Sequence, residues 1–267
     1  MAKSILMCEP KFFDVSYEIN PWMTGRIGQI DHVKAKMQWY QLLNALSQEF
    51  IVYNLLGKES LPDLVFTANA GFIHQKTAIL SRFSTQERSH EEPVYANWFE
   101  KNGFQVFQPL NSYEGEGDHL VDKSDRHWMG YGFRSTLEAS VEISDRLCTQ
   151  INTLRLVDPR WYHLDTCFCP LPNGEVMWYP GAFDQSSQDL IRSSFDNSIE
   201  IDLNDALLFA CNCVTNDRHL YMPAGTNVSH HLRDIGYKVW EGDFSEFLKA
   251  GGAAKCLTLH IRSPLLF

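Results

Sequence analysis

The sequence predicts an α/β fold built from repeated strand–helix modules. Short strand-like runs alternate with amphipathic helices along the whole chain, and no Pro/Gly/Ser-rich linker divides it. A weak internal repeat supports this prediction, because residues 98–107 and 231–240 each have the pattern of a helix end, a glycine and a strand. A glycine-bearing segment follows each copy, at 114–118 and 251–256. Recurrence of modules of about 50 residues predicts a propeller-like or pseudo-symmetric α/β fold.

The clearest helix is predicted over residues 30–50. Val33, Met37, Tyr40 and Leu43 recur at spacings of four, three and three, which gathers them on one helix face. Strands are predicted at 51–53, 64–67 and 77–80.

A β-hairpin is predicted in the second half of the chain. Residues 163–169 and 175–179 have strand-like composition, and they are joined by a segment that contains Asn173 and Gly174. Because Asn-Gly is a strong signal for a tight hairpin turn, the two runs are expected to pair.

The composition is that of a folded protein with a sizeable core. The chain has 267 residues, of which 44% are hydrophobic and 13% aromatic. The formal net charge of −10 disfavours nucleic acid or an anionic membrane as the main partner. This charge is compatible with a cationic substrate, but it is weak evidence for one, because a solvated acidic surface explains it more simply.

The seven cysteines predict a reducing environment. Residues 1–7 have an apolar run too short for a signal peptide, and no run approaches the roughly 18 apolar residues of a membrane span. Without an export signal, an odd number of cysteines is expected to remain as reduced thiols in the cytoplasm.

Three carboxylates are grouped in one short segment. Glu114, Glu116 and Asp118 alternate with Gly115 and Gly117, and glycine lets the backbone come close to a ligand. An acidic loop of this kind is also typical of a solvated turn, so the segment alone indicates no function.

Three further residues are candidates for chemistry. His163 and Asp165 lie two residues apart in the predicted hairpin, so they share one face of a strand. Asn69 ends an apolar run, and Cys256 follows a run of small residues where little bulk would block access. Each residue alone is explained by packing or by an ordinary hydrogen bond.

Taken together and in this order, these segments resemble the motifs of the guanidino-group-modifying superfamily, which includes arginine deiminases, dimethylarginine dimethylaminohydrolases and amidinotransferases. The chain looks most like the arginine dihydrolase domain of cyanobacterial bifunctional arginine-catabolic enzymes. The resemblance extends from residue 7 to Cys256, and its further supporting segments are 7–10, 17–23, 66–72, 87–88 and 130–134.

The resemblance implies the pentein α/β propeller, in which five ββαβ modules surround a pseudo-fivefold axis. The active site of such a fold lies in the central channel. Residues 1–267 are then expected to form a single catalytic domain that acts on a small molecule, arginine or a related guanidine. A homo-oligomer is compatible with this reading, and no cofactor or metal is implied.

The resemblance also implies a set of catalytic roles. Cys256 would attack the guanidinium carbon and form a thiouronium intermediate, since a thiolate is a strong nucleophile and a bound cation favours its formation. His163 would protonate the departing ammonia and then activate water. Glu114 would pair with the guanidinium, and Asp165 would orient the substrate nitrogens or the imidazole. The family's usual motif is Glu-Gly-Gly-Asp, and the extra residue here leaves Glu116 as an alternative to Glu114.

Asn69 bears on whether arginine is hydrolysed once or twice. Deiminases and dimethylarginine hydrolases carry Asp at the matching position, whereas the arginine dihydrolases share this Asn. An Asn can donate to the ureide oxygen of citrulline, and an Asp would leave that oxygen unpaired at a cost of about 1–3 kcal/mol. The residue therefore favours an arginine dihydrolase, which gives ornithine, carbon dioxide and ammonia, over a deiminase or a dimethylarginine dimethylaminohydrolase, which gives citrulline.

The amino-acid end of the substrate is expected to meet a separate group of residues. By the same resemblance, Asn20, Arg88 and Arg134 would recognise it, because arginine binds a carboxylate through two parallel hydrogen bonds. Asp118 and Phe66 are also expected to bind substrate.

Three other interpretations remain open from the sequence. Cys167 with Cys169, and Cys211 with Cys213, could supply four thiolates to zinc in a non-enzymatic protein, although both pairs lie in apolar strand-like runs that indicate packing. A pentein that binds without turnover, or an amidinotransferase that uses an amine acceptor, would share the same fold.

Overall fold

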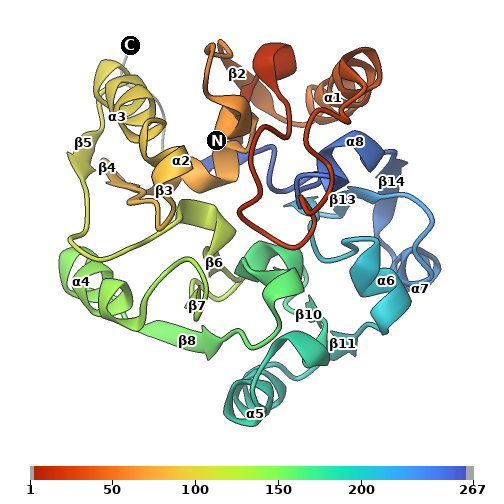
Figure 1. The fold of residues 1–267 in the computed structure, drawn as a ribbon. Helices are drawn as coiled ribbons and strands as arrows, with labels where there is room; N and C mark the ends of the chain where they lie inside the picture. The colour runs from red at the N-terminus through yellow and green to blue at the C-terminus, as the bar shows by residue number, and fades with distance from the viewer. Residues whose placement is uncertain (1–2, 263–267) are drawn as a thin grey trace.

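The computed structural model describes residues 3–262 and shows five three-stranded sheets arranged in a ring (Figure 1). The second module illustrates the repeated unit. Strand β3 (Gly71–His74) pairs antiparallel with β4 (Thr77–Leu80), and after helix α3 (Glu92–Lys101) strand β5 (Gln105–Phe107) runs parallel to β4. A parallel neighbour requires a crossover, which the helix supplies. The predicted propeller of five ββαβ modules is therefore confirmed.

Three other modules repeat this order of hairpin, helix and parallel strand. Their elements are β6 (His119–Val121), β7 (His127–Tyr131), α4 (Leu137–Leu147) and β8 (Ile151–Arg155); β9 (Phe168–Pro170), β10 (Val176–Trp178), α5 (Gln185–Ser194) and β11 (Ser198–Glu200); and β12 (Val214–Asn216), β13 (His219–Pro223), α7 (Val228–Asp234) and β14 (Lys238–Gly242).

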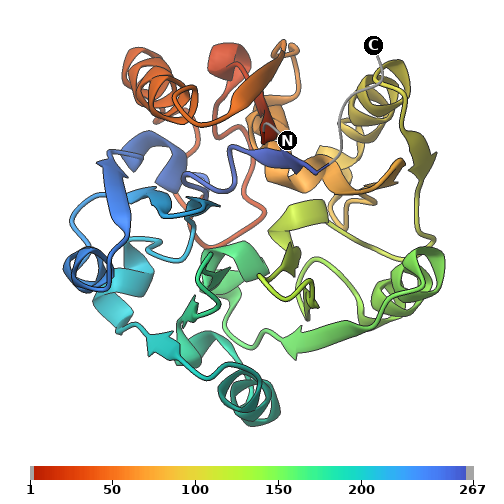
Figure 2. The ribbon, with the colours of Figure 1, turned by 180° about the vertical axis from the view of Figure 1, so that it is seen from behind.

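The two ends of the chain together complete the first module. Strand β1 (Ser4–Cys8) lies between β2 (Ile51–Leu55), which is parallel to it, and β15 (Leu259–Ile261), which is antiparallel to it. Helix α1 (His32–Leu46) connects β1 to β2. Figure 2 shows the strand from the C-terminal part of the chain seated beside the N-terminal part. The pairing closes the ring and holds Cys256, three residues before β15, close to the start of the chain.

Short helices and 3₁₀ turns fill the remaining positions. They are α2 (Gln86–Ser89), α6 (Leu203–Leu207) and α8 (Ser245–Leu248), with 3₁₀ turns at Pro10–Phe12, Pro62–Val65, Thr67–Ala70, Gly115–Gly117, Pro159–Trp161, Leu164–Thr166 and Pro180–Ala182. Within residues 3–262, no helix is long and apolar enough to cross a membrane.

Local sequence signals account for the helix ends. Asp31, Thr136 and Asp184 each accept a hydrogen bond from the third backbone N–H of the helix that follows, which satisfies a donor that has no partner inside the helix. Gly103 and Gly236 follow α3 and α7 with φ of +83° and +98°, a conformation that favours glycine. The predicted repeat of helix end, glycine and strand is thus confirmed in both copies.

The predicted first helix is confirmed, but the face assigned to it is wrong. Val33 is 81% exposed and Met37 is 52% exposed, and the buried apolar stripe consists instead of Trp39, Leu42 and Leu46. These three also recur at helical spacing, and together they offer more apolar area to the core. The helix therefore turns them inward and leaves the smaller stripe in solvent.

Two predicted strands are turns in the structure. Residues 64–67 lie across two consecutive 3₁₀ turns, Pro62–Val65 and Thr67–Ala70, and residues 163–167 contain the turn Leu164–Thr166 before β9 begins at Phe168. His163 and Asp165 therefore share a turn rather than a strand face. Residues 64–66 are apolar because they are buried at the centre of the ring, so their composition resembles that of a strand. Residues 163–167 are equally buried, but they include the polar residues His163, Asp165 and Thr166. The hairpin is confirmed by the pairing of β9 with β10.

Candidate active site

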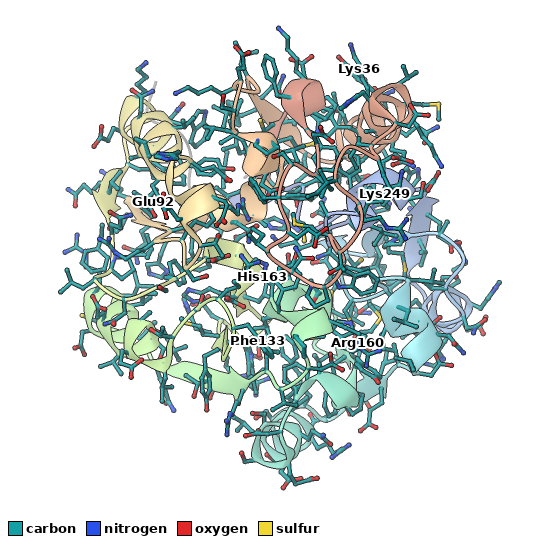
Figure 3. All side chains as sticks on the ribbon, viewed as in Figure 1. Lys36, Glu92, Phe133, Arg160, His163 and Lys249 are labelled. Carbon is teal, nitrogen blue, oxygen red and sulfur yellow. The ribbon has the colours of Figure 1, made fainter. Side chains whose placement is uncertain are left out.

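Five inner segments, one from each module, meet at the centre of the ring. They are the turns Thr67–Ala70, Gly115–Gly117 and Leu164–Thr166 and the segments 208–213 and 253–257, and we call them the hub. Each lies directly before, or one residue before, the first strand of its module. The pseudo-fivefold repeat therefore carries residues far apart in sequence to one place, where Figure 3 shows His163.

A small closed cavity lies against the hub. It is lined by Ile19, Asn20, Met23, Asp63, Phe66, Asn69, Arg88, Arg134, Tyr162, His163, Ala250, Gly251 and Cys256. Its volume of about 10 Å³ is roughly what one water molecule needs. The segment between the turn Pro10–Phe12 and α1 crosses the centre of this face as a long loop (Figure 1).

The thiol of Cys256 is buried and held by two hub residues. Its Sγ lies 3.3 Å from Asp165 Oδ2 and receives a hydrogen bond of 3.0 Å from Asn212 Nδ2. Burial and the nearby Asp165 carboxylate raise the pKa of this thiol well above its usual value. In the free protein the sulfur therefore carries its proton and donates it toward Asp165.

His163 and Glu114 form a buried pair beside the thiol. His163 Nε2 lies 2.7 Å from Glu114 Oε2, and Ser84 donates to the other oxygen through its backbone N–H and its hydroxyl. Burial alone would raise the pKa of Glu114, but Arg134 and the hydrogen bond with His163 hold it well below its usual value. Glu114 therefore remains a carboxylate in this water-poor centre.

Glu116 faces a different part of the structure. Its carboxylate accepts hydrogen bonds from Lys255 Nζ at 2.9 Å, from the backbone N–H of His260 at 3.0 Å and from Arg262 Nη2 at 3.3 Å. These residues belong to the segment that leads into and continues through β15. Glu114, which contacts His163 and Arg134, is the glutamate placed beside the cavity.

Asp118 holds two pieces of the hub together. Its Oδ2 accepts from the backbone N–H and the hydroxyl of Ser135, and its Oδ1 accepts from the backbone N–H of Leu164 at 3.0 Å. Burial raises the pKa of Asp118 to about 6. The carboxyl thus supports the turn that carries His163.

Asn69 is oriented by Arg88. Its Oδ1 accepts from Arg88 Nη1 at 2.7 Å, so its NH₂ group points the other way and donates to the backbone oxygen of Glu114 at 3.3 Å. Arg88 also donates two hydrogen bonds to the carboxylate of Glu91. Both residues are buried, so this carboxylate compensates the loss of hydration of the Arg88 cation.

Arg134 and Asn20 connect the covering loop to the hub. Arg134 donates to the backbone oxygen of Ile19 at 2.8 Å and stacks on the ring of Tyr162. Asn20 Nδ2 donates to the backbone oxygen of Ala250 at 3.1 Å. Phe66 packs edge-to-face on Phe13 at the wall of the cavity, 4% exposed. The predicted substrate-binding residues other than Asp118 thus line the cavity.

Sequence reasoning missed two residues at this centre. Asp63 lines the cavity, and its Oδ2 accepts from Tyr17 at 2.9 Å, whereas Oδ1 is buried without a hydrogen-bond partner among the described residues. Burial raises the pKa of Asp63. A carboxylate within an apolar run was a signal that could have found it. Asn212 lies between two cysteines in a similar run, and its contact with Cys256 was not predicted.

The paired cysteines are packing residues. Cys211 donates to the backbone oxygen of Met177, and Cys169 contacts the backbone oxygen of Cys213. Across residues 3–262, no three His, Cys, Asp or Glu side chains come together in a way that could hold a metal ion. The interpretation of these cysteines as zinc ligands is therefore wrong for the described part of the chain.

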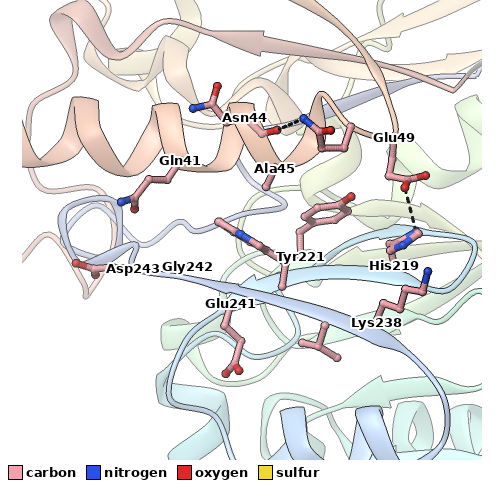
Figure 4. Close-up of a pocket in the computed structure, with 13 residues that line it drawn as sticks. Gln41, Asn44, Ala45, Glu49, His219, Tyr221, Lys238, Glu241, Gly242 and Asp243 are labelled. Carbon is pink, nitrogen blue, oxygen red and sulfur yellow. Dashed lines mark hydrogen bonds and ion pairs between the residues drawn. The ribbon is translucent and has the colours of Figure 1, made fainter.

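A second hollow lies between α1 and the strands β13 and β14, where it forms an open groove (Figure 4). Gln41, Glu49, His219 and Lys238 line it, and His219 Nδ1 is 3.6 Å from Glu49 Oε1. Its lining includes no cysteine. The central cavity is lined by the Cys256 thiol, the His163 imidazole and the Asp63 carboxylate, and Glu114 and Asp165 bond directly to His163 and Cys256 from behind this lining. It is therefore the candidate active site.

Comparison with known families gives one strong match over most of the chain. The family model described as N,N dimethylarginine dimethylhydrolase, eukaryotic, matches residues 21–263. The N(G),N(G)-dimethylarginine dimethylaminohydrolase of Mycobacterium tuberculosis is 37% identical over 257 residues, which cover 96% of this chain and 84% of that protein.

Longer relatives are similar over the same length. The bifunctional arginine dihydrolase/ornithine cyclodeaminase AgrE of Nostoc is 45% identical over 266 residues, which cover 97% of this chain and 38% of that protein. This chain thus spans about two fifths of the length of such a relative. The crystal structure of the N-terminal domain of ArgZ, a cyanobacterial arginine dihydrolase, bound to substrate as a Cys-to-Ser mutant, matches with a TM-score of 0.96 and 43% identity over 99% of this chain and 100% of that one.

Proposed function

Because this chain belongs to the N,N-dimethylarginine dimethylhydrolase family, we propose that it is a cysteine hydrolase acting on the guanidinium group of arginine. The proposed overall reaction converts one arginine and two waters into ornithine, carbon dioxide and two ammonia. The observation that carries the proposal is the closed central cavity, where the thiol of Cys256 and the pair of His163 and Glu114 converge beside Asn69. Residues 1–267 would act as a single catalytic domain.

Cys256 is the proposed nucleophile, and the substrate itself activates it. In the free protein, burial and Asp165 keep the thiol protonated. A bound guanidinium would place a positive charge against the sulfur and pair with Asp165, whose Oδ1 has no hydrogen-bond partner among the described residues. The thiol proton would pass to His163, so the thiolate forms only when there is a carbon for it to attack. Addition of the sulfur to that carbon and cleavage of a C–N bond, with ammonia taking the proton from His163, would leave a covalent thiouronium.

His163 is the proposed acid and base. It would give a proton to the departing ammonia and then take one from the water that attacks the thiouronium carbon. Glu114, 2.7 Å from Nε2, would stabilise the imidazolium form and also pair with the guanidinium. The low pKa of Glu114 supports both roles, because the carboxylate keeps its charge throughout the cycle.

Asn69 supports the second hydrolysis. Arg88 fixes Oδ1, so the NH₂ group faces the site, and its hydrogen bond to the backbone oxygen of Glu114 uses one of two hydrogens. The second hydrogen would bind the ureide oxygen of citrulline. The first product would then be held for another attack by Cys256 instead of being released.

The amino-acid end of arginine would lie under the covering loop. We infer that Arg134 and Arg88 contribute to binding the α-carboxylate, with Asn20 at the same end, and that the unpaired oxygen of Asp63 accepts from the α-ammonium group. The cavity of about 10 Å³ is too small for arginine. The loop that carries Asn20 must therefore move aside for the substrate to enter.

The test is incubation of the purified protein with arginine, followed by analysis of all products. Ornithine with two equivalents of ammonia supports the proposal, and accumulation of citrulline would contradict the second hydrolysis. Cys256→Ser is expected to abolish turnover, so surviving activity in that variant would contradict the nucleophile. Dimethylarginine is tested in parallel, because the family match and the relative from Mycobacterium tuberculosis favour it as the second candidate substrate.

A further inference from the structure

We propose that Asn212 is a positioning residue that orients the sulfur of Cys256 and stabilises its ionised form. The inference rests on the proposed function in one respect, namely that Cys256 is the nucleophile. Asn212 is fully buried and lies in the inner segment 208–213, which the fifth module contributes to the hub. The catalytic roles proposed above come from the other four modules.

The carboxamide of Asn212 makes four hydrogen bonds. Its Oδ1 accepts from the backbone N–H groups of Ala253 and Cys256, both at 3.1 Å. Its Nδ2 donates to Cys256 Sγ at 3.0 Å and to the backbone oxygen of Asp165 at 3.2 Å. One side chain thus joins the segment that carries the nucleophile, the sulfur itself and the turn Leu164–Thr166.

The orientation of this amide follows from its partners. Two backbone N–H groups can only be met by the amide oxygen, so the NH₂ group must face the sulfur. An N–H donor directed at sulfur favours the thiolate over the thiol. It opposes burial and the Asp165 carboxylate, which both disfavour the thiolate. Together with the backbone N–H of Ala253, Asn212 therefore favours ionisation of the sulfur in the free protein, before the substrate adds its charge.

The substitution Asn212→Asp tests separately the two roles of the side chain, which are to accept hydrogen bonds from the backbone and to donate one to the sulfur. An aspartate has the same shape and keeps an acceptor for Ala253 and Cys256, but it replaces the donor to Sγ by a second oxygen. Asn212→Ser removes the carboxamide without adding a charge, and its hydroxyl lies on a shorter side chain than the amide group that reaches Sγ. Asn216 on β12, 3% exposed, is the matched position, and Asn216→Asp places the same change in a buried site outside the hub.

The experiment measures the rate at which iodoacetamide alkylates Cys256 as a function of pH, without arginine, by mass spectrometry of the peptide that contains it. Reading a single peptide excludes the signal of Cys148, which is exposed. Asn212→Asp is expected to shift the midpoint of the profile upward by about one pH unit or more, which is about tenfold slower alkylation below the midpoint. Asn212→Ser is expected to shift it in the same direction by less, and Asn216→Asp is expected to leave it unchanged.

The thermal melting temperature of each variant is measured alongside, so that a folding defect is recognised. If Asn212→Asp does not fold, Asn212→Ser decides the question. A folded variant with a lowered melting temperature and an unchanged alkylation profile would overturn the proposal and leave Asn212 with a structural role. This readout needs no turnover, so it is distinguishable from a failure of the wild-type protein to hydrolyse arginine.

Discussion

Glu114 and Glu116 stand two residues apart in one turn, and both are fully buried, yet their surroundings differ. Glu114 contacts His163, Ser84 and Arg134 at the edge of a cavity. Glu116 is surrounded by donors from the segment that closes the ring.

The difference shows how one acidic motif can serve two purposes in this fold. The segment is a 3₁₀ turn with about three residues per turn, so side chains two residues apart point in different directions: Glu114 meets His163 and Glu116 meets the segment of β15. Desolvating a carboxylate is costly in either place, and each is compensated by cations and hydrogen bonds. At Glu116 the compensation joins the last strand to the third module, and at Glu114 it prepares a charged pair beside the thiol.

Glu114→Gln should give the largest effect on activity. The variant loses the charge that stabilises the imidazolium of His163 and the guanidinium, and a fall in kcat/KM of about a thousandfold or more is expected, which corresponds to about 4 kcal/mol of transition-state stabilisation. Steady-state release of ammonia from arginine measures it. A variant that keeps more than about a tenth of the wild-type value would show that Glu114 is structural, as Glu116 is inferred to be.

Glu116→Gln should give the opposite profile. Lys255, which is 4% exposed, would keep a buried charge without its counterion, so the free energy of unfolding is expected to fall by about 3 kcal/mol or more. Denaturant titration measures this loss, and kcat/KM measured well below the melting temperature is expected to stay within about tenfold of wild type. An unchanged free energy of unfolding would contradict the role of Glu116 in closing the ring.

Asn69→Asp should alter the product more than the rate of the first hydrolysis. The added carboxylate oxygen replaces the donor proposed for the ureide of citrulline, so the second hydrolysis is expected to slow by about ten- to a hundredfold, equivalent to about 1–3 kcal/mol. The ratio of citrulline to ornithine, followed over time by chromatography, is expected to rise. An unchanged ratio would mean that something other than Asn69 retains citrulline.

The sequence predicted the fold and most residues of the candidate site for one reason, which is that motif residues and modules are local. Asn69, His163 and Cys256 each lie in a short segment whose residue types are visible without the structure. Asn212 could not be found in this way, because its function depends on a segment more than forty residues further along the chain. The wrong strand at 64–67 has a similar cause: burial at the hub makes this turn as apolar as a strand, and sequence composition reports burial rather than backbone shape.

The exposed stripe of α1 also shows that sequence composition leaves part of the structure undecided. Val33 and Met37 recur at helical spacing, but Trp39 and Leu42 form a second stripe on the same helix. Periodicity shows that a helix exists, and it does not decide between two apolar faces. The choice is made by which face fills more of the space against the neighbouring modules.

Asp118 offers a third carboxyl of the same segment and the smallest expected effect. Its pKa of about 6 lies above the value of about 3.9 for an unfolded aspartate. As the pH rises, the unfolded chain therefore releases this proton first, and the folded state keeps it. The contribution of this group to the free energy of unfolding is expected to decrease, by an amount on the order of 2 kcal/mol, as the pH rises from about 4 to about 6. Above pH 6 this contribution is expected to stay constant.

The variant Asp118→Asn removes the titration and keeps one acceptor oxygen, which can serve the two donors of Ser135. Its NH₂ group then faces the backbone N–H of Leu164, so the variant is expected to be less stable at every pH. Denaturant titrations at pH 4, 5, 6 and 7 should therefore show a flatter profile across this window in the variant than in the wild type. Glu114 and Glu116 act with the opposite sign, since their lowered pKa values make stability fall as the solution becomes acidic, below the range of about pH 4.3 where unfolded glutamate titrates. Other buried groups titrate in the same window, among them Glu91, whose pKa burial raises to about 7, so the test is the difference between the two profiles. A wild-type profile no steeper than that of Asp118→Asn between pH 4 and 6 would show that Asp118 is ionised in the folded protein and that its bonds to Ser135 outweigh its burial.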